Sequence, residues 1–109
     1  MKVNVDNEDG IVMVRPNGKL DALTAPVLQE SLDRILAEGS LRLVIDMTEV
    51  RYVSSAGLRV FIRVGRQLMQ TGKMSVTGLH SSVRQVFEMA GFHLIMTICD
   101  DLNSAKAAV

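Results

Sequence analysis

Polar and apolar residues alternate near the start of the sequence, which is the pattern of β-strands. Val3 and Val5 lie between polar neighbours, and a β-branched run follows at residues 11–14. The intervening residues 7–10 are Asn, Glu, Asp and Gly, which favour a tight turn. The pattern predicts an antiparallel hairpin, with another turn at residues 16–18.

A helical pattern follows the hairpin. Apolar residues recur at intervals of one helical turn, namely Leu28, Leu32, Ile35 and Leu36. Thr24 is expected to cap this helix, Pro26 suits its first turn, and Gly39 stops it. Residues 41–47 then form a nearly continuous apolar run, which predicts a strand that is covered on both faces.

A second helix and a further strand come next. Ser54 and Ser55 open a helix that Gly72 ends, and residues 73–77 predict a short strand. One side of this helix collects apolar residues, namely Leu58, Phe61, Val64 and Leu68. The alternation of strand and helix predicts parallel strand pairs after the hairpin.

The last third of the sequence repeats this alternation. A third helix is expected to begin at a capping box formed by Ser82 and Gln85. Residues 96–99 predict an edge strand, and a short terminal helix follows Asp100 or Asp101. The complete order β-β-α-β-α-β-α-β-α predicts an α/β fold with a mixed sheet of four to five strands and four helices.

Composition fits a single domain over residues 1–109. The chain is 48% apolar and 22% charged, the mixture of a soluble globular protein. It has no apolar leader, no run of the roughly 18 apolar residues of a membrane span, and one cysteine, so we expect a cytoplasmic protein. Twelve basic and twelve acidic residues, with no Trp, argue against nucleic-acid binding.

Few residues have recognisable catalytic or metal-binding chemistry. The sequence has no phosphate-binding glycine loop, and His80 and His93 lie 13 positions apart without a cysteine pair. We therefore expect no metal and no cofactor. Cys99 lies in an apolar run and is expected to be an inert, buried thiol. Asp46 ends a strand, where a carboxylate serves either a functional site or the hydrogen bonds of the following loop.

The most informative stretch is residues 44–58. A buried strand ends in Asp46, a short loop follows, and Ser54, Ser55 and Gly57 stand at a helix start. The free N–H groups and the positive dipole end of a helix favour an anion, including a phosphate carried on a serine. Capping of the helix by one serine is the alternative interpretation.

Two stretches of the sequence have the form of a known signature. The first is a strand that ends in Asp before a Ser-x-Gly helix start, carried by Asp46, Thr48, Val50, Val53, Ser55, Gly57 and Leu58. The second is G-K-L-D-A-L-T-A at residues 18–25. Together with the order of elements, they resemble the STAS domain family of bacterial anti-sigma factor antagonists over essentially the whole chain. The resemblance implies a STAS-like sheet with an N-terminal antiparallel hairpin.

The resemblance also implies partner switching. In this family the antagonist binds an anti-sigma factor that is also a serine/threonine kinase, which frees a sigma factor. The kinase then phosphorylates a serine at the start of the second helix and breaks the complex, and a serine phosphatase restores it. The matching phosphoacceptor is Ser55, supported by Gly57 and Arg59. Ser54 stands where the family often has Asp and is an alternative acceptor or the cap, and Ala56 replaces a frequent second hydroxyl.

The second helix places basic residues beside Ser55. At 100° per residue, one face collects Ser55, Arg59, Arg63 and Arg66, and Ile62 and Met69 border it. This face is either simply solvated or a docking surface for an acidic partner. Asp21 matches a family position near the partner surface and, with Thr24, completes the predicted partner-binding set. A cap for the first helix is the alternative role of Asp21.

Charge is divided unevenly along the chain. Residues 1–50 contain five basic and nine acidic side chains, and residues 51–109 contain seven basic and three acidic ones. No acidic residue occurs between Arg51 and Phe87. A phosphate on Ser55 would therefore enter a basic segment.

Two other classes of function remain open. The same fold would serve as a sensory scaffold, or as the partner of a transporter, without any phosphoswitch. A small hydrolase or phosphotransfer enzyme would use Asp46 or Ser55 covalently, but no positioned histidine base or metal cluster accompanies them. We therefore expect a binding module rather than an enzyme.

Overall fold

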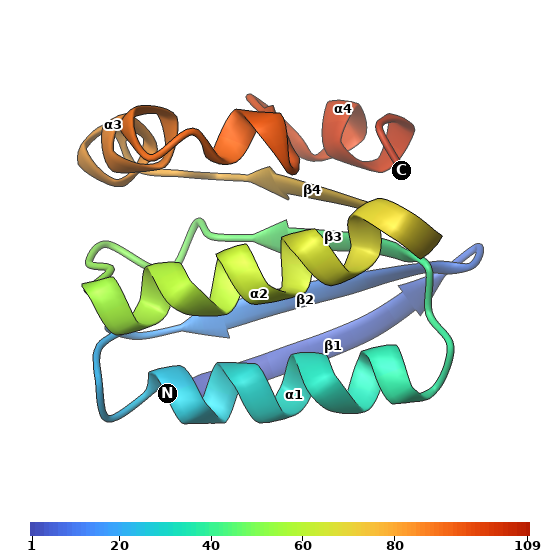
Figure 1. Cartoon of the computed structure of the whole chain (residues 1–109), viewed down its shortest axis with the longest axis horizontal. Coiled ribbons are helices and arrows are strands. Elements are labelled where there is room, and N and C mark those ends of the chain that lie inside the picture. The colour runs from blue at the N-terminus through green and yellow to red at the C-terminus, as the bar shows by residue number, and fades with distance from the viewer.

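The computed structural model describes residues 1–109, and its centre is a five-stranded mixed sheet (Figure 1). The strands lie side by side in chain order: β1 (Lys2–Glu8), β2 (Ile11–Asn17), β3 (Arg42–Asp46), β4 (Lys73–Thr77) and β5 (Thr97–Cys99). β1 pairs antiparallel with β2, and every later pair is parallel. The predicted hairpin, mixed sheet and edge strand are confirmed.

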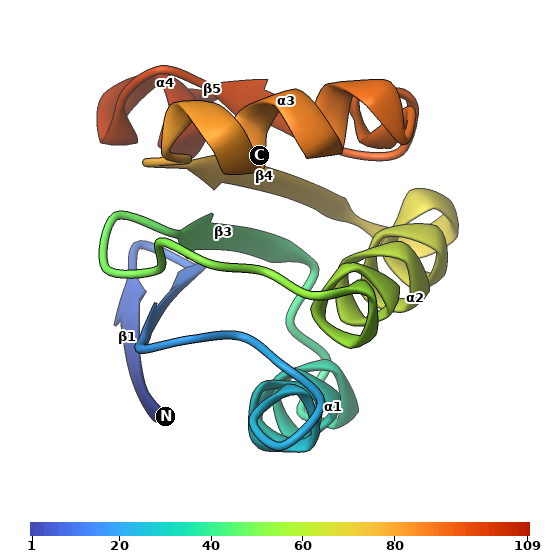
Figure 2. The same cartoon turned by 90° about the vertical axis from the view of Figure 1, so that its left-hand side faces the viewer.

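Three α-helices and one 3₁₀ helix connect the strands, and a fourth α-helix follows the last strand. They are α1 (Ala25–Ala37), α2 (Ser55–Thr71), α3 (Ser81–Met89), the 3₁₀ helix η1 (Phe92–Leu94) and α4 (Leu102–Ala107). Side chains of α1, α2 and α3 join the larger hydrophobic core on one face of the sheet, and α4 covers the other face. Figure 2 shows α1 and α2 together on one side of the strands. None of the helices combines the length and the apolar character that crossing a bilayer requires.

The central strand β3 is buried from both sides. Leu43 and Ile45 are fully buried in the larger core, and Val44 is fully buried on the opposite face with Ala105 of α4. The Ser75 hydroxyl donates a hydrogen bond of 2.7 Å to the Ala105 carbonyl, which fixes α4 to this face. The strand therefore needs apolar side chains at successive positions, as its continuous apolar run predicted.

Two predicted helix caps are wrong. The N-cap residue of α3 is His80 and the helix begins at Ser81, so Ser82 lies inside the helix and forms no capping box with Gln85. Thr24 directly precedes α1, but its backbone is already helical and its side chain makes no capping hydrogen bond. A side chain caps a helix from an extended backbone, which neither Ser82 nor Thr24 adopts.

Candidate functional site

The candidate site lies at the carboxyl ends of the parallel strands. Residues 47–54 form the β3–α2 loop, which passes between the β2–α1 loop and the β4–α3 loop. Figure 1 shows these loops at the end of the sheet where α1 and α2 begin. Binding sites of open α/β sheets are commonly found at this edge.

Backbone hydrogen bonds hold the β3–α2 loop against the β2–α1 loop. The Leu20 N–H donates to the Tyr52 carbonyl (3.0 Å), and the Leu20 carbonyl accepts from the Ser54 N–H (2.8 Å). Leu20 also pairs with Val53 as an isolated parallel bridge, and its side chain is fully buried. The start of α2 is therefore anchored on the side of α1.

Asp46 supports the same loop where it leaves β3. One carboxylate oxygen accepts hydrogen bonds from the backbone N–H and the hydroxyl of Thr48, at 3.1 and 2.5 Å. The other oxygen lies 3.4 Å from Nε of Arg15 on β2. Both oxygens are engaged within the chain, which fits the loop-supporting interpretation of Asp46 better than a role as a nucleophile.

The β4–α3 loop contributes two residues that lie outside the predicted site. His80 Nε2 lies 2.8 Å from the Thr48 carbonyl oxygen. Gly78 has a φ of +75°, and a Cβ there would come within 2.8 Å of Asp46 Oδ1. Both residues follow directly after β4, the neighbour of β3, and adjacent parallel strands end at the same edge of a sheet. Their place in the sequence, just after the strand next to β3, is therefore the signal from which they could have been predicted.

Ser54 and Ser55 have different roles at the start of α2. Ser54 is the N-cap: its backbone is extended, and its Oγ accepts a hydrogen bond of 3.4 Å from the Gly57 N–H. Ser55 is the first residue of the helix, with an exposed side chain whose hydroxyl makes no hydrogen bond within the chain. Capping by one serine, which the sequence suggested, thus leaves the second serine free.

Gly57 lets α2 approach the neighbouring loops closely. A Cβ at this position would lie 2.7 Å from Leu20 Cγ and 2.9 Å from Val53 Cγ1. Any larger side chain would push the start of the helix away from the loops that anchor it. This packing is how Gly57 supports the position of Ser55.

Asp21 organises the turn that leads into α1. Its Oδ1 accepts hydrogen bonds from the N–H groups of Leu23 (3.0 Å) and Thr24 (3.1 Å). The pKa of the Asp21 carboxyl is lowered, chiefly by the hydrogen bond from the Thr24 backbone. The Thr24 hydroxyl donates instead to the Lys19 carbonyl (2.6 Å). Asp21 therefore takes the capping role that the sequence suggested for Thr24.

The outward side of α2 carries three exposed arginines, Arg59, Arg63 and Arg66, which we call the arginine face. None of them forms an ion pair, whereas the arginines of β2, α1 and α3 each pair with a carboxylate. On the opposite side of α2, the predicted residues Phe61, Val64 and Leu68 are buried, and Leu58 is partly buried. The arginine face therefore presents positive charge that no group of the chain neutralises.

A groove of about 340 Å³ lies between the starts of α1 and α2, and we call it the α1–α2 groove. Most of its lining is small or apolar, and the full set is Ala22, Ala25, Pro26, Gln29, Ala56, Arg59, Val60 and Arg63. Leu23, in the turn before α1, is 87% exposed, more than any other large hydrophobic side chain. The predicted site did not include Leu23, because its exposure depends on the turn that Asp21 caps.

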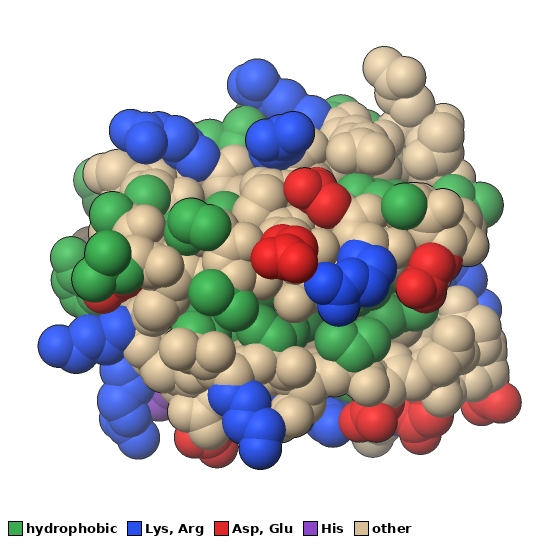
Figure 3. Space-filling model, turned by 90° about the horizontal axis from the view of Figure 1, so that it is seen from below, with side chains coloured by type: hydrophobic (Ala, Val, Ile, Leu, Met, Phe, Trp, Pro, Cys, Tyr) green, Lys and Arg blue, Asp and Glu red, His purple; other side chains and the backbone are tan.

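Charge is distributed unevenly over the surface as well as along the chain. Figure 3 looks onto the side of the molecule on which α1 lies and shows acidic side chains across the middle, with a basic one among them, and along the lower edge. Basic side chains gather along the upper margin of the same view. Glu30, Asp33 and Glu38 of the α1 region are all exposed. The arginine face of α2 thus borders an acidic region and remains distinct from it.

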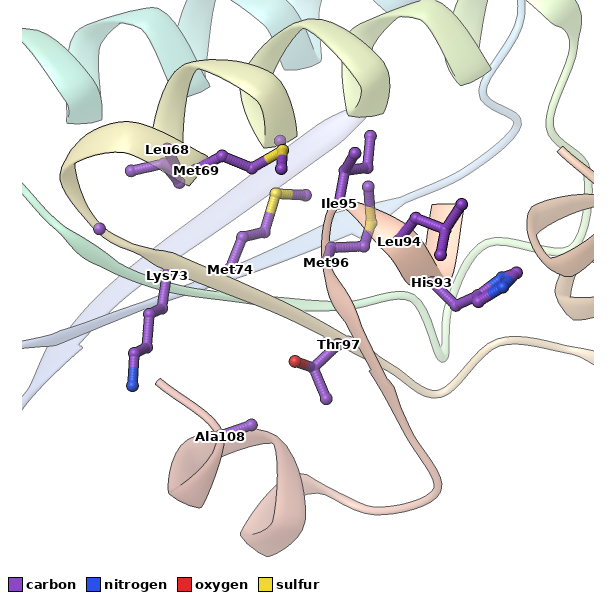
Figure 4. A pocket seen from close by; sticks show the side chains of 12 residues that line it. Leu68, Met69, Lys73, Met74, His93, Leu94, Ile95, Met96, Thr97 and Ala108 are labelled. Carbon is purple, nitrogen blue, oxygen red and sulfur yellow. The ribbon is translucent and has the colours of Figure 1, made fainter. Parts of the chain in front are cut away.

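Met69 does not lie near Ser55. It is 14 residues further along α2, a distance of about 21 Å at the rise of an α-helix. Its side chain is 58% exposed. It lines a separate hollow of about 360 Å³ with Met74, Leu94, Ile95 and Met96 (Figure 4). Ile62 is half-buried against the core. Of the two predicted apolar anchors, Met69 is therefore distant from Ser55, and Ile62 exposes only part of its side chain.

The remaining residues with metal or nucleophile chemistry do not gather. The chain has no group of three or more His, Cys, Asp or Glu residues that could hold a metal ion. His93 is exposed in η1. Cys99 on β5 is partly buried, and burial is the main cause that raises the pKa of its thiol. A raised pKa keeps the thiol protonated at neutral pH and makes it a poor nucleophile.

Comparison with known proteins identifies the family. Residues 2–105 match the family model of the STAS domain. The chain belongs to the STAS domain family. BtrV of Bordetella bronchiseptica, named as a candidate anti-sigma factor antagonist, is 35% identical over 109 residues, 99% of this chain and 94% of that protein. The anti-sigma-F factor antagonist RsfB of Mycobacterium tuberculosis is 27% identical over 108 residues, covering 95% and 88%.

A solved structure agrees with the STAS fold. The crystal structure of an anti-sigma factor antagonist from Mycobacterium paratuberculosis matches with a TM-score of 0.90 and 27% identity. The match covers 99% of this chain and 92% of that one. The fold and family implied by the sequence motifs are confirmed, and phosphorylation of Ser55 stays a prediction.

Proposed function

We propose that this STAS domain protein is an anti-sigma factor antagonist whose binding is switched off by phosphorylation of Ser55. Its partner is an anti-sigma factor with serine/threonine kinase activity, and the complex frees a sigma factor for transcription. The observation that carries the proposal is the exposed Ser55 hydroxyl, free of hydrogen bonds, at the start of the helix that bears the arginine face. The names of the relatives from Bordetella and Mycobacterium support the antagonist role.

In the unphosphorylated state the partner meets a surface that is already formed. The β3–α2 loop is held by Leu20 on one side and by Asp46 and His80 on the other, so binding orders few groups. The arginine face supplies unpaired positive charge for acidic groups of the partner. Asp21 adds a negative charge at the start of α1. The positive arginine face and this negative charge together favour one orientation of the partner.

A phosphate on Ser55 changes the charge of this surface and preserves the fold. Phosphoserine carries about −1.5 to −2 charges at neutral pH. Arg59 lies one helical turn further along α2, so the phosphate neutralises part of the arginine face and repels acidic groups of the partner. Because the Ser55 hydroxyl makes no hydrogen bond within the chain, its modification breaks no hydrogen bond of the folded protein.

Ser54 is the less suitable acceptor. Its Oγ caps α2, and the residue is only partly exposed. Its partial burial and its hydrogen bond with the Gly57 N–H make its hydroxyl less accessible to a kinase than that of Ser55. In the proposed cycle the kinase and a serine phosphatase carry out the chemistry, and this protein acts by binding. We expect it in the cytoplasm, where sigma factors act.

The test uses the purified protein, the ATP-binding anti-sigma factor encoded near it, and the corresponding sigma factor. With ADP we expect a complex of antagonist and anti-sigma factor, and displacement of the sigma factor, in size-exclusion chromatography. With ATP we expect this complex to dissociate. Failure to form a complex with ADP rejects the antagonist function. A complex equally stable with ADP and ATP rejects the phosphoswitch and favours a scaffold.

A further inference from the structure

The α1–α2 groove lies immediately beside the proposed phosphosite. Ala56, the residue after Ser55, forms part of one wall, which continues along α2 through Arg59 to Arg63. The opposite wall is the turn before α1 and the first turns of α1. A partner that contacts Ser55 therefore reaches the mouth of the groove as well.

The groove combines an apolar floor with two free positive charges. Ala25 and Val60 are buried at its base, and no acidic side chain lines it. Arg59 and Arg63 have no ion-pair partner within the chain, in contrast to Arg34 of α1, which pairs with Glu30. A volume of about 340 Å³ is near the lower end of ligand-sized pockets. Such a space suits one or two protruding side chains.

We propose that the α1–α2 groove receives an apolar side chain of the anti-sigma factor that has a carboxylate close to it. The apolar side chain contacts the alanines and Val60, and the carboxylate pairs with Arg63. Leu23 does not line the groove, but it follows the lining residue Ala22 and is exposed, so it offers a further apolar contact to a partner at this end of α1. This inference rests on the proposed function, and it specifies which part of the surface the partner recognises and by what chemistry.

The same placement links the groove to the switch. A phosphate on Ser55 lies one helical turn from Arg59 and draws its guanidinium away from the groove. Arg63 lies two turns from Ser55, about 12 Å along the helix, and stays in the groove wall. Phosphorylation therefore removes one of the two charges that the partner's carboxylate meets and adds negative charge at the mouth.

The experiment fills the groove and leaves Ser55 unchanged. Ala22→Trp places a large side chain in the groove from an exposed position, and Ala37→Trp, exposed at the far end of α1, is the matched control. Calorimetry measures binding to the anti-sigma factor with ADP, and thermal melting checks that each variant is folded. We expect Ala22→Trp to weaken binding by at least about tenfold and Ala37→Trp to bind like the wild type.

A pair of charge variants tests whether a carboxylate of the partner pairs with Arg63. Arg63→Gln removes a charge that lines the groove, and Arg66→Gln removes one on the same helix outside it. We expect about a tenfold loss of affinity for Arg63→Gln and a clearly smaller loss for Arg66→Gln. Equal losses would indicate a diffuse basic surface and would overturn the proposal.

Two further outcomes for Ala22→Trp would overturn the proposal, and a third outcome concerns the wild-type protein. If folded Ala22→Trp binds as tightly as the wild type, the groove is not the receptor. If Ala22→Trp instead changes the mass of the free protein, measured by light scattering, the groove binds a second copy of this chain and the proposal is overturned. If the wild-type protein forms no complex, the proposed function itself fails, and that result is separate from any effect of the variants.

Discussion

The chain has two serine pairs at helix starts, and their surroundings differ. Ser54 caps α2 and Ser55 follows it as the first residue of the helix. In α3 the cap position belongs to His80, which makes no capping side-chain hydrogen bond, and Ser81 and Ser82 both lie within the helix. Ser55 and Ser81 are thus equivalent in position, and both are exposed.

The two serine pairs differ in the arginine that lies one helical turn further along. Arg59, four residues after Ser55, has no ion pair. Arg84, three residues after Ser81, is held by two carboxylates, and these bonds raise its pKa. A phosphate on Ser55 meets a free positive charge, whereas one on Ser81 competes with Glu88 and Asp100. A helix start with an exposed hydroxyl is therefore not sufficient for a charge switch, which also needs a neighbouring charge that is still unpaired.

Gly57→Ala is expected to have the largest effect of the changes at the start of α2, because Gly57 packs closely against the loops that anchor this helix. Its methyl group would lie 2.7 Å from Leu20 Cγ, so we expect the free energy of unfolding to fall by about 1–3 kcal/mol. The control is Gly65→Ala in the same helix, whose methyl group meets only flexible side-chain ends at 3.3 Å. Urea unfolding measures both, and equal stability of the two variants would contradict this account.

Ser55→Asp tests the difference between the two exposed serines. The added charge should weaken the complex with the anti-sigma factor by at least about tenfold, because it opposes the arginine face. The melting temperature should be unchanged or slightly raised, since a negative charge is favourable at a helix N-terminus. Ser81→Asp is the matched control and should bind like the wild type. Unfolding of Ser55→Asp, or equal losses for both variants, would speak against a surface switch.

Ser54→Ala and Ser82→Ala compare the capping serine with one that caps nothing. Ser54→Ala removes the acceptor of the Gly57 N–H, and we expect a loss of about 1 kcal/mol in the free energy of unfolding. Ser82→Ala should stay within about 0.5 kcal/mol of the wild type. Chemical denaturation distinguishes them. A greater loss of stability for Ser82→Ala would support the capping box predicted from the sequence and would contradict the structure.

The smallest effect concerns the acid dependence of stability. The pKa of Asp21 lies below its ordinary value of 3.8, because the folded state holds the ionised carboxyl with backbone N–H groups. This stabilisation is complete above the ordinary pKa and is lost as the pH falls through the lowered one.

Asp21→Asn keeps the acceptor oxygen and abolishes the titration. The decrease in melting temperature between about pH 6 and about pH 2.5 should therefore be smaller in this variant than in the wild type. Asp101 caps α4 in the same way, and its pKa is lowered by the Ser104 N–H, so Asp101→Asn provides a parallel case. An acid dependence that Asp21→Asn leaves unchanged would contradict the capping role of Asp21.

Hydrophobic patterning was enough to predict the strands, the first three α-helices and most of the buried side of α2, whereas α4 was expected from its capping aspartate. The continuous apolar run at residues 41–47 likewise predicted the double burial of β3, since both faces of that strand need apolar side chains. These features follow from the repeat of apolar positions, which local sequence contains in full.

The details of the site depend on contacts between distant segments, and local sequence does not contain them. The cap of α3 is His80 instead of Ser82 because the preceding loop is fixed to Thr48, 32 residues earlier. The α1–α2 groove arises from how two helices pack, and the exposure of Leu23 from a turn capped by Asp21. Helical angles placed Met69 beside the arginines, and it does follow Arg66 by three residues, but these angles give no position along the axis, where Met69 lies about 21 Å from Ser55.

The most direct test of the central claim is to map phosphorylation by mass spectrometry after incubation with the anti-sigma kinase and ATP. We predict one phosphate, on Ser55, and none on Ser81 or Ser82, and we predict that Ser55→Ala abolishes modification and preserves the ADP-dependent complex. A phosphate on Ser81 or Ser82 with Ser55 unmodified, or no phosphate at all from a kinase that is active in the same assay, would contradict the account.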